Sequence, residues 1–193
     1  MNLMANIMRR RHHLPSNKSR RGIAAVEFAL TLPIWITLLL GVSDGAYCML
    51  VNERVDRIAY TVTDVVSQYQ TITIANLNDI TQAAGQMMQP LTFGSMGNVV
   101  VTSVYKPSGQ TPTICWQYKG GGNLGQNSKI GSTGGVPALP NGLTLNDNDN
   151  VIITEVFYYF SPMFISEGLF SSNIVYRTAV YKPRLSPLIT APS

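Results

Sequence analysis

The chain has 193 residues, 12% of them charged and 45% hydrophobic, and a formal net charge of +4. This length suits one modest folded domain together with a membrane segment. The positive charge belongs to the start of the chain: residues 1–22 carry +6 and no acid, whereas the other 8 basic and 10 acidic residues give the rest −2. The sequence therefore predicts a basic leader at 1–22 and argues against a nucleic-acid-binding surface on the folded domain.

An apolar stretch follows the leader. The run 28–42 holds no charged residue, and residues 23–50 are interrupted only by Glu27 and Asp44. About 20 apolar residues suffice to cross a bilayer as a helix, so we predict a transmembrane helix over 23–50. The basic segment before it predicts that the leader lies in the cytoplasm and that everything after residue 50 lies outside it.

Two residues, Pro33 and Gly22, indicate the shape of this span and whether it stays in the mature protein. Pro33 lies inside it and leaves the carbonyl of Ala29 without a helical donor, which predicts a bend. Gly22 precedes the apolar core, whereas the small residues of a secretory signal peptide follow its core. The order found here favours an anchor that stays in the mature protein.

The helix is predicted to continue outside the membrane over 51–70. Apolar residues recur there at spacings of three and four, from Val51 to Tyr69, with charged residues between them. This pattern is typical of an amphipathic helix with one apolar stripe. Joined to the span, it makes a rod of about 70 Å at 1.5 Å per residue. The stripe packs either against the chain's own domain or against another subunit, and the pattern leaves both open.

Residues 71–193 are predicted to form an extracytoplasmic β-rich domain. A short helix is expected over 76–89, capped by Asn76 or Asn78. Runs rich in β-branched and aromatic residues predict strands, and a long, mobile loop rich in Gly, Asn, Ser and Pro is expected at 119–150. The predicted fold class is α+β, a long N-terminal transmembrane and amphipathic helix packed on a small antiparallel sheet. The predicted strands are 99–105, 113–118, 151–160 and 173–181.

The predicted domain offers little for catalysis. The only histidines, His12 and His13, lie in the leader, so the domain has no histidine base or metal ligand. Glu155 lies within a strand among apolar residues and is expected to face solvent. The segment 146–150 alternates Asn and Asp, which leaves a calcium loop open as an alternative to a plain turn. We predict no enzyme activity, no metal site, no cofactor and no small-molecule substrate.

The two cysteines, Cys48 and Cys115, have neither CxxC nor zinc-site spacing. In an oxidising compartment they can pair within the chain or between chains. Two free, buried thiols are the alternative.

Glu27 is the strongest site candidate. Translocon-insertion scales put an ionised side chain at the bilayer centre at a cost of roughly 2.5–3.5 kcal/mol, so a carboxylate in a span points to a functional role with a partner. The predicted partner is a free α-amine, which exists only if the chain is cut after Gly22. Alternatively, the first helical turn lies among the headgroups, and Glu27 is only a favourable charge near a helix N-terminus.

The junction 22–28 reads GIAAVEF, and Pro33 follows it. It resembles the prepilin processing motif of the Tad/Flp (tight adherence) pilus systems, and with its two preceding arginines it is similar to the start of TadE-like pseudopilins. Residues 153–164 and 176–184 are similar to the C-terminal strands of that family. The resemblance covers most of the chain, and the segment 120–150 is its least family-like part. A major Flp subunit is far shorter, so the resemblance implies a minor subunit.

The resemblance implies that a prepilin peptidase cuts between Gly22 and Ile23 on the cytoplasmic side. It also implies that Glu27, with Phe28, sets the register between subunits during assembly. The implied partners are the peptidase, an inner-membrane pilus assembly platform, other pilin or pseudopilin subunits and the lipid bilayer. The implied location is the bacterial inner membrane, crossed once, with the domain in the periplasm, and after assembly the cell surface within a pilus.

The sequence therefore predicts a minor pseudopilin that is incorporated through its N-terminal helix. The alternative is an unprocessed single-pass membrane protein. Its periplasmic domain would be a protein-binding module of the same or another envelope machine.

Overall fold

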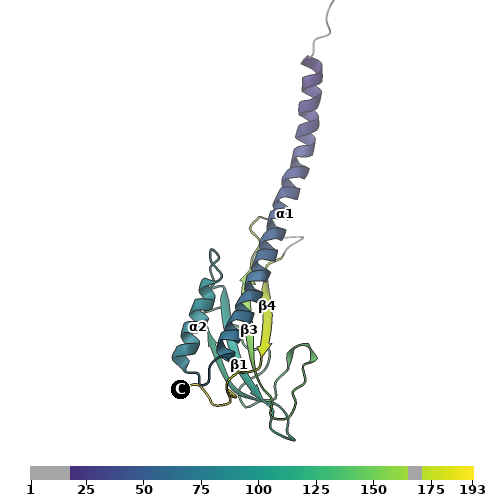
Figure 1. The fold of residues 1–193 in the computed structure, drawn as a ribbon. Coiled ribbons are helices and arrows are strands. Elements are labelled where there is room, and N and C mark those ends of the chain that lie inside the picture. Colours follow the sequence, from purple (N-terminus) through teal and green to yellow (C-terminus); the bar gives the residue numbers. More distant parts are fainter. Residues whose placement is uncertain (1–17, 165–170) are drawn as a thin grey trace, which may run out of the picture. The chain divides into compact units, whose positions relative to one another are not determined.

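A computed structural model describes residues 18–164 and 171–193, with side chains from residue 22 onward. The chain divides into two units, Met1–Leu40 and Gly41–Ser193, here called the N-terminal and C-terminal units. Most of the predicted leader lies outside the described residues. The elements are α1 (Lys18–Ser67), α2 (Ile74–Gln86), β1 (Gly97–Tyr105), β2 (Thr113–Gly120), a 3-10 turn (Pro140–Gly142), β3 (Asn150–Phe160) and β4 (Asn173–Tyr181) (Figure 1).

The helix α1 confirms the predicted long N-terminal helix and ends at Ser67, three residues before the expected end at residue 70. Within the C-terminal unit, its apolar stripe is buried in the core with residues of the sheet. Of the two partners that the sequence left open for this stripe, the chain's own sheet is therefore one. The buried stripe residues are Val51, Val55, Ile58, Val62 and Val66.

The short helix α2 starts two residues earlier than predicted and has a different cap. The Oγ1 atom of Thr73 accepts a hydrogen bond from the Asn76 amide at 3.2 Å, and Asn76 Oδ1 accepts one from the Thr73 amide at 3.2 Å. Asn76, one of the two expected caps, is therefore the third helical residue of a capping box. Leu77 and Ala84 on the inner side of α2 are buried.

All four predicted strands form, and they pair in the order β2-β1-β3-β4 with every pair antiparallel. The register places Val99 opposite Val156 and Ser103 opposite Ile152. Because side chains alternate across a strand, Ile152 and Val156 share the face that contacts α1. The fold class, a long apolar helix with a four-stranded antiparallel sheet, is confirmed.

The other face of the sheet is covered by the segment that links β2 to β3. Ile130 and Leu145 of this segment are buried with Val151 and Ile153 of β3 in a second apolar cluster. Ile130 and Leu145 thus attach this segment to the sheet, and between β2 and β3 it forms no helix or strand other than the 3-10 turn. The mobility expected for the loop at 119–150 stays a prediction. The sheet is covered on both faces, which explains why β1 and β3 are buried along almost their whole length.

Candidate functional site

The predicted processing site lies on helical backbone. Gly22 and Ile23 follow the first turn of α1, which begins at Lys18. A Cβ atom added at Gly22 would meet no described atom within 4 Å beyond its own helix. Glycine in a helix costs about 1 kcal/mol relative to alanine. Among the described residues, no close contact requires glycine at this position.

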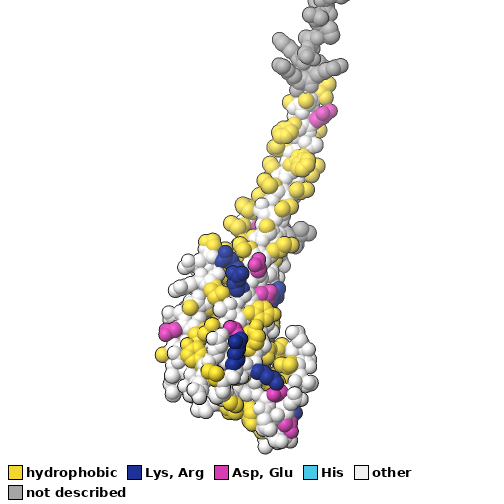
Figure 2. Space-filling model, in the orientation of Figure 1, with side chains coloured by type: hydrophobic (Ala, Val, Ile, Leu, Met, Phe, Trp, Pro, Cys, Tyr) yellow, Lys and Arg dark blue, Asp and Glu magenta, His cyan; other side chains and the backbone are white. Residues whose placement is uncertain are grey.

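The side chains of the described N-terminal unit form an apolar surface. Every residue from 22 to 39 is exposed, and Phe28 and Trp35 are 63% and 64% exposed. In Figure 2 hydrophobic side chains cover most of this part of α1. Within the described part of the chain, α1 is the single helix long and apolar enough to cross a membrane. An apolar helix end near the N-terminus fits a membrane anchor.

Glu27 is the acidic residue of this surface. Its backbone carbonyl accepts a hydrogen bond from the Thr31 hydroxyl at 3.1 Å. Among the residues whose side chains are described, no salt bridge includes Glu27. A cationic partner for its carboxylate must therefore come from outside those residues.

Pro33 lies inside α1, and the helix continues through it. The Thr37 hydroxyl donates a hydrogen bond to the Pro33 carbonyl at 2.9 Å. Thr31, six residues before Thr37, donates to the Phe28 carbonyl at 3.2 Å. Neither hydrogen bond goes to the Ala29 carbonyl, which is the one that Pro33 leaves without a helical donor. The bend at Pro33 stays a prediction.

Asp44 is a site candidate that sequence reasoning missed. Its side chain is fully buried, and its Oδ1 accepts hydrogen bonds from the backbone amides of Met163 at 2.9 Å and Phe164 at 3.2 Å. The signal was present in the sequence, because Asp44 is in helical phase with the apolar positions Val51 and Val55. A carboxylate in phase with a buried stripe is expected to have dedicated partners.

The two cysteines are free thiols. Cys48 follows Tyr47, whose ring lies 5.5 Å from that of Phe160 at one end of β3. Cys115 lies in β2 next to Trp116. Trp116 pairs with Ser103 of β1, and Ser103 pairs with Ile152 of β3. Since Ile152 and Phe160 are roughly 26 Å apart along the strand, and a disulfide needs Cα atoms within about 7 Å, no bond forms within this chain. A disulfide between chains stays a prediction, and burial raises the pKa of the Cys115 thiol.

Glu155 is fully buried, so the expectation that it faces solvent is wrong. Its carboxylate accepts hydrogen bonds from the Lys129 amide at 2.8 Å, from the Tyr176 hydroxyl at 2.9 Å and from the Ser128 hydroxyl. The Lys129 ammonium lies 4.0 Å from the centre of the Tyr176 ring. Glu155 therefore attaches the covering segment to the sheet. The prediction of a solvent-facing side chain failed because both faces of the sheet are covered.

The Asn-rich segment 146–150 forms ion pairs with lysines. Lys106 Nζ lies 3.0 Å from the Asp147 carboxylate, and Lys182 Nζ lies 2.7 Å from that of Asp149. Hydrogen bonds from these lysines hold the pKa of each carboxyl below its usual range. Among the described residues, no three His, Cys, Asp or Glu side chains gather as metal ligands would. A charged-pair turn accounts for this segment without calcium.

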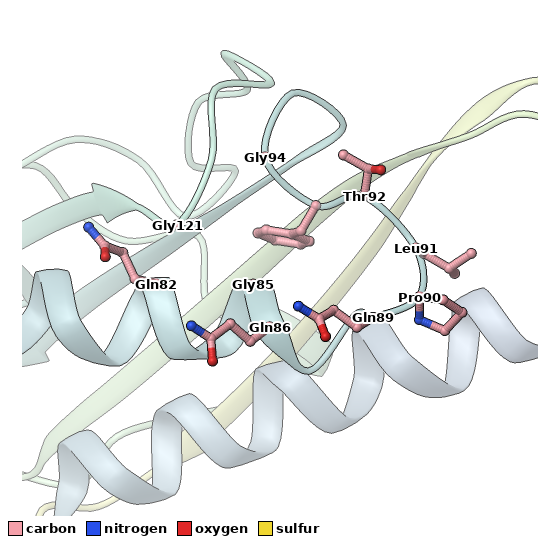
Figure 3. Close-up of a pocket in the computed structure, with 10 residues that line it drawn as sticks. Gln82, Gly85, Gln86, Gln89, Pro90, Leu91, Thr92, Gly94 and Gly121 are labelled. Atoms are coloured by element: carbon pink, nitrogen blue, oxygen red, sulfur yellow. The ribbon is translucent and has the colours of Figure 1, made fainter.

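An open cavity of about 590 Å³ lies beside the end of α2. Figure 3 shows the side chains of Gln82, Gln86 and Gln89 along one side of it, with Gly94 and Gly121 on the other. The lining consists of glutamine amides, glycine backbone, the Thr92 hydroxyl and the apolar side chains of Pro90, Leu91 and Phe93, with no charged residue or histidine. It offers hydrogen bonds to a polar partner.

Comparison with known families adds one finding. A family model described as TadE-like protein matches residues 22–64, which begin at the predicted processing site and end near the end of α1. Neither the search of curated proteins nor that of solved structures found a match. The predicted resemblance to the TadE-like family is thus confirmed over this segment. A TadE-like segment suggests a protein associated with a Tad pilus.

Proposed function

We propose that the protein is a minor pseudopilin of a Tad/Flp-type pilus, incorporated through α1 after a prepilin peptidase cuts between Gly22 and Ile23. The match over residues 22–64 supports this role, because it includes the cleavage motif and the apolar helix. The role is structural, and its partners are the peptidase, the inner-membrane assembly platform, other pilin-like subunits and the bilayer.

One observation carries the proposal, which is the carboxylate of Glu27 on an exposed apolar helix, with no salt bridge to any side chain that the structure describes. A cut after Gly22 makes Glu27 the fifth residue of the mature chain and creates an α-amine at Ile23. The carboxylate of one subunit can then pair with the α-amine of the next, and this pairing offsets the cost of each buried charge. Register along the filament follows, because the pair forms at one axial position.

Before assembly we place the protein in the inner membrane, with residues 23–42 in the bilayer. These residues cover about 30 Å as a helix, the thickness of the hydrocarbon core. This segment is shorter than the span 23–50 inferred from composition, because Asp44 is buried among residues of the C-terminal unit. The basic leader favours a cytoplasmic N-terminus and a periplasmic sheet.

The first test is the N-terminal residue of the protein extracted from membranes, read by intact mass and N-terminal sequencing. The expected result is Ile23 in cells with an active prepilin peptidase and Met1 in cells that lack it. An uncut chain in both strains would contradict processing.

The second test is Glu27→Ala, with Glu53→Ala as a matched control at an exposed glutamate of the same helix. We expect Glu27→Ala to insert in the membrane normally but to be lost from sheared pili. Glu53→Ala is expected to leave incorporation unchanged. Normal incorporation of Glu27→Ala would remove the register role.

A second candidate function is a permanent membrane anchor with a protein-binding domain. The cavity beside α2 favours it, because amide groups and exposed backbone are suited to binding a polar segment of another envelope protein. An uncut N-terminus together with loss of partner capture on Gln86→Ala would select this function over the pseudopilin.

A further inference from the structure

The loop that follows β3 is attached to α1 by a carboxylate. Asp44 is fully buried, and Phe164 donates its backbone N–H towards both oxygens, at 3.2 Å and 3.3 Å, while Met163 donates to Oδ1 at 2.9 Å. The Asp44 carboxylate thus fixes the backbone of these two residues against the helix.

The side chains of the same two residues point away from the core. Met163 is 66% exposed and Phe164 is 56% exposed, although both are large and apolar. Pro162, directly before them, is buried. Met163 and Phe164 are therefore an exposed apolar pair on a backbone that Asp44 holds.

The position of Asp44 in the chain indicates how deep Met163 and Phe164 lie relative to the proposed membrane span. Asp44 follows Val42, the last residue of the proposed span, by two positions, which is about 3 Å along a helix. The headgroup region begins where the apolar run ends. With residues 23–42 in the bilayer, as proposed above, the backbone fixed to Asp44 is at the depth where the bilayer meets water.

Hydrogen bonding favours lipid as the contact at this depth. A backbone N–H that enters an apolar environment without a partner is costly, which keeps most loops out of the bilayer surface. Asp44 already satisfies the amides of Met163 and Phe164. Their side chains can enter the boundary between headgroups and acyl chains without exposing an unpaired donor, and aromatic side chains are favoured there.

We infer that Met163 and Phe164, held by Asp44, form a second membrane contact beside the helix, inserted at the outer surface of the bilayer. This inference rests on the proposed placement of residues 23–42 in the membrane. A single helix leaves a domain free to rotate and tilt, and a second contact limits the orientation of the sheet before assembly.

The test is photo-crosslinking of the full chain in lipid vesicles of phosphatidylethanolamine and phosphatidylglycerol. The photoreactive residue p-benzoyl-phenylalanine replaces Phe164, Trp35 or Leu185 in three separate proteins. Leu185 is the matched control, because it is 68% exposed and Arg184 before it binds the end of α1 at Ser67. Intact mass identifies each adduct as lipid or as a second chain.

We expect lipid adducts from positions 35 and 164 and none from position 185. Asp44→Ala should abolish the adduct at 164 and leave that at 35, whereas Asp64→Ala, at the other end of α1, should change neither. Lipid adducts at 35 with none at 164, or adducts at 164 with a second chain only, would overturn the inference and leave the anchor intact.

Two further outcomes are also decisive. No lipid adduct at 35 would remove the membrane placement itself, and the inference with it. Unchanged labelling at 164 in Asp44→Ala would overturn the role of the carboxylate. If Asp44→Ala does not fold, the comparison of positions 164 and 185 in the otherwise unchanged chain still decides the contact.

Discussion

The two halves of α1 distribute their apolar residues around the helix in different ways. From residue 22 to 39 every side chain is exposed, so the apolar surface surrounds the helix. From Val51 to Val66 the apolar residues form one stripe, which the sheet buries, and charged residues occupy the other side. A helix that is apolar all round needs an apolar surrounding such as lipid or other helices, whereas a striped helix needs a single partner face. One continuous helix thus meets two environments.

The largest expected effect comes from truncating the striped half. Ile58→Ala removes a fully buried side chain and should lower the free energy of unfolding of the C-terminal unit by about 2–5 kcal/mol. Ile34→Ala, where the side chain is 67% exposed, should change it by less than about 0.5 kcal/mol. Denaturant titration of detergent-solubilised protein, followed by near-ultraviolet circular dichroism, measures both. Equal losses of stability in Ile58→Ala and Ile34→Ala would contradict the description of a buried stripe in one half of α1 and exposed side chains in the other.

A smaller effect is expected at the second face of the sheet. Glu155→Ala leaves the Lys129 amide and the Tyr176 hydroxyl without their acceptor and should lower the free energy of unfolding by about 1–3 kcal/mol. The covering segment should then detach, and trypsin should cut after Lys129 faster than in the unchanged protein. Glu53→Ala serves as the control on an exposed glutamate. Unchanged cleavage would show that Glu155 does not fasten this segment.

The smallest effect is a dependence of stability on alkaline pH. Burial, and then the neighbouring Tyr47, raise the pKa of Tyr158 from 10.0 to about 12. Between these values the unfolded chain loses this proton and the folded chain keeps it, so stability falls as the pH rises from about 10 to about 12. The denaturant midpoint at about pH 11 should be lower than at about pH 9, and less so in Tyr158→Phe. An equal decrease in Tyr158→Phe and in the control Tyr159→Phe would exclude Tyr158 as a source.

The local elements could be predicted because each depends on residues close in sequence. Val51, Val55 and Ile58 recur with the helical period, and the strand runs are marked by β-branched residues between prolines. The cap of α2 was misplaced because Asn76 suits both a cap and the third position of a capping box, and only the Thr73 contact distinguishes them. Asp44 and Glu155 were misjudged because their partners lie far away in the chain.

The sequence by itself determined the long helix, the four strands, the basic leader and the motif at Gly22–Phe28, since composition and short-range periodicity encode each of them. Only the tertiary structure decided the strand order, the covering of the second sheet face, the separation of Cys48 from Cys115 and the burial of Asp44 and Glu155. The physical reason is that a buried carboxylate is stable only where distant backbone and hydroxyl donors converge on it. That convergence is a property of the folded chain and leaves no period in its sequence.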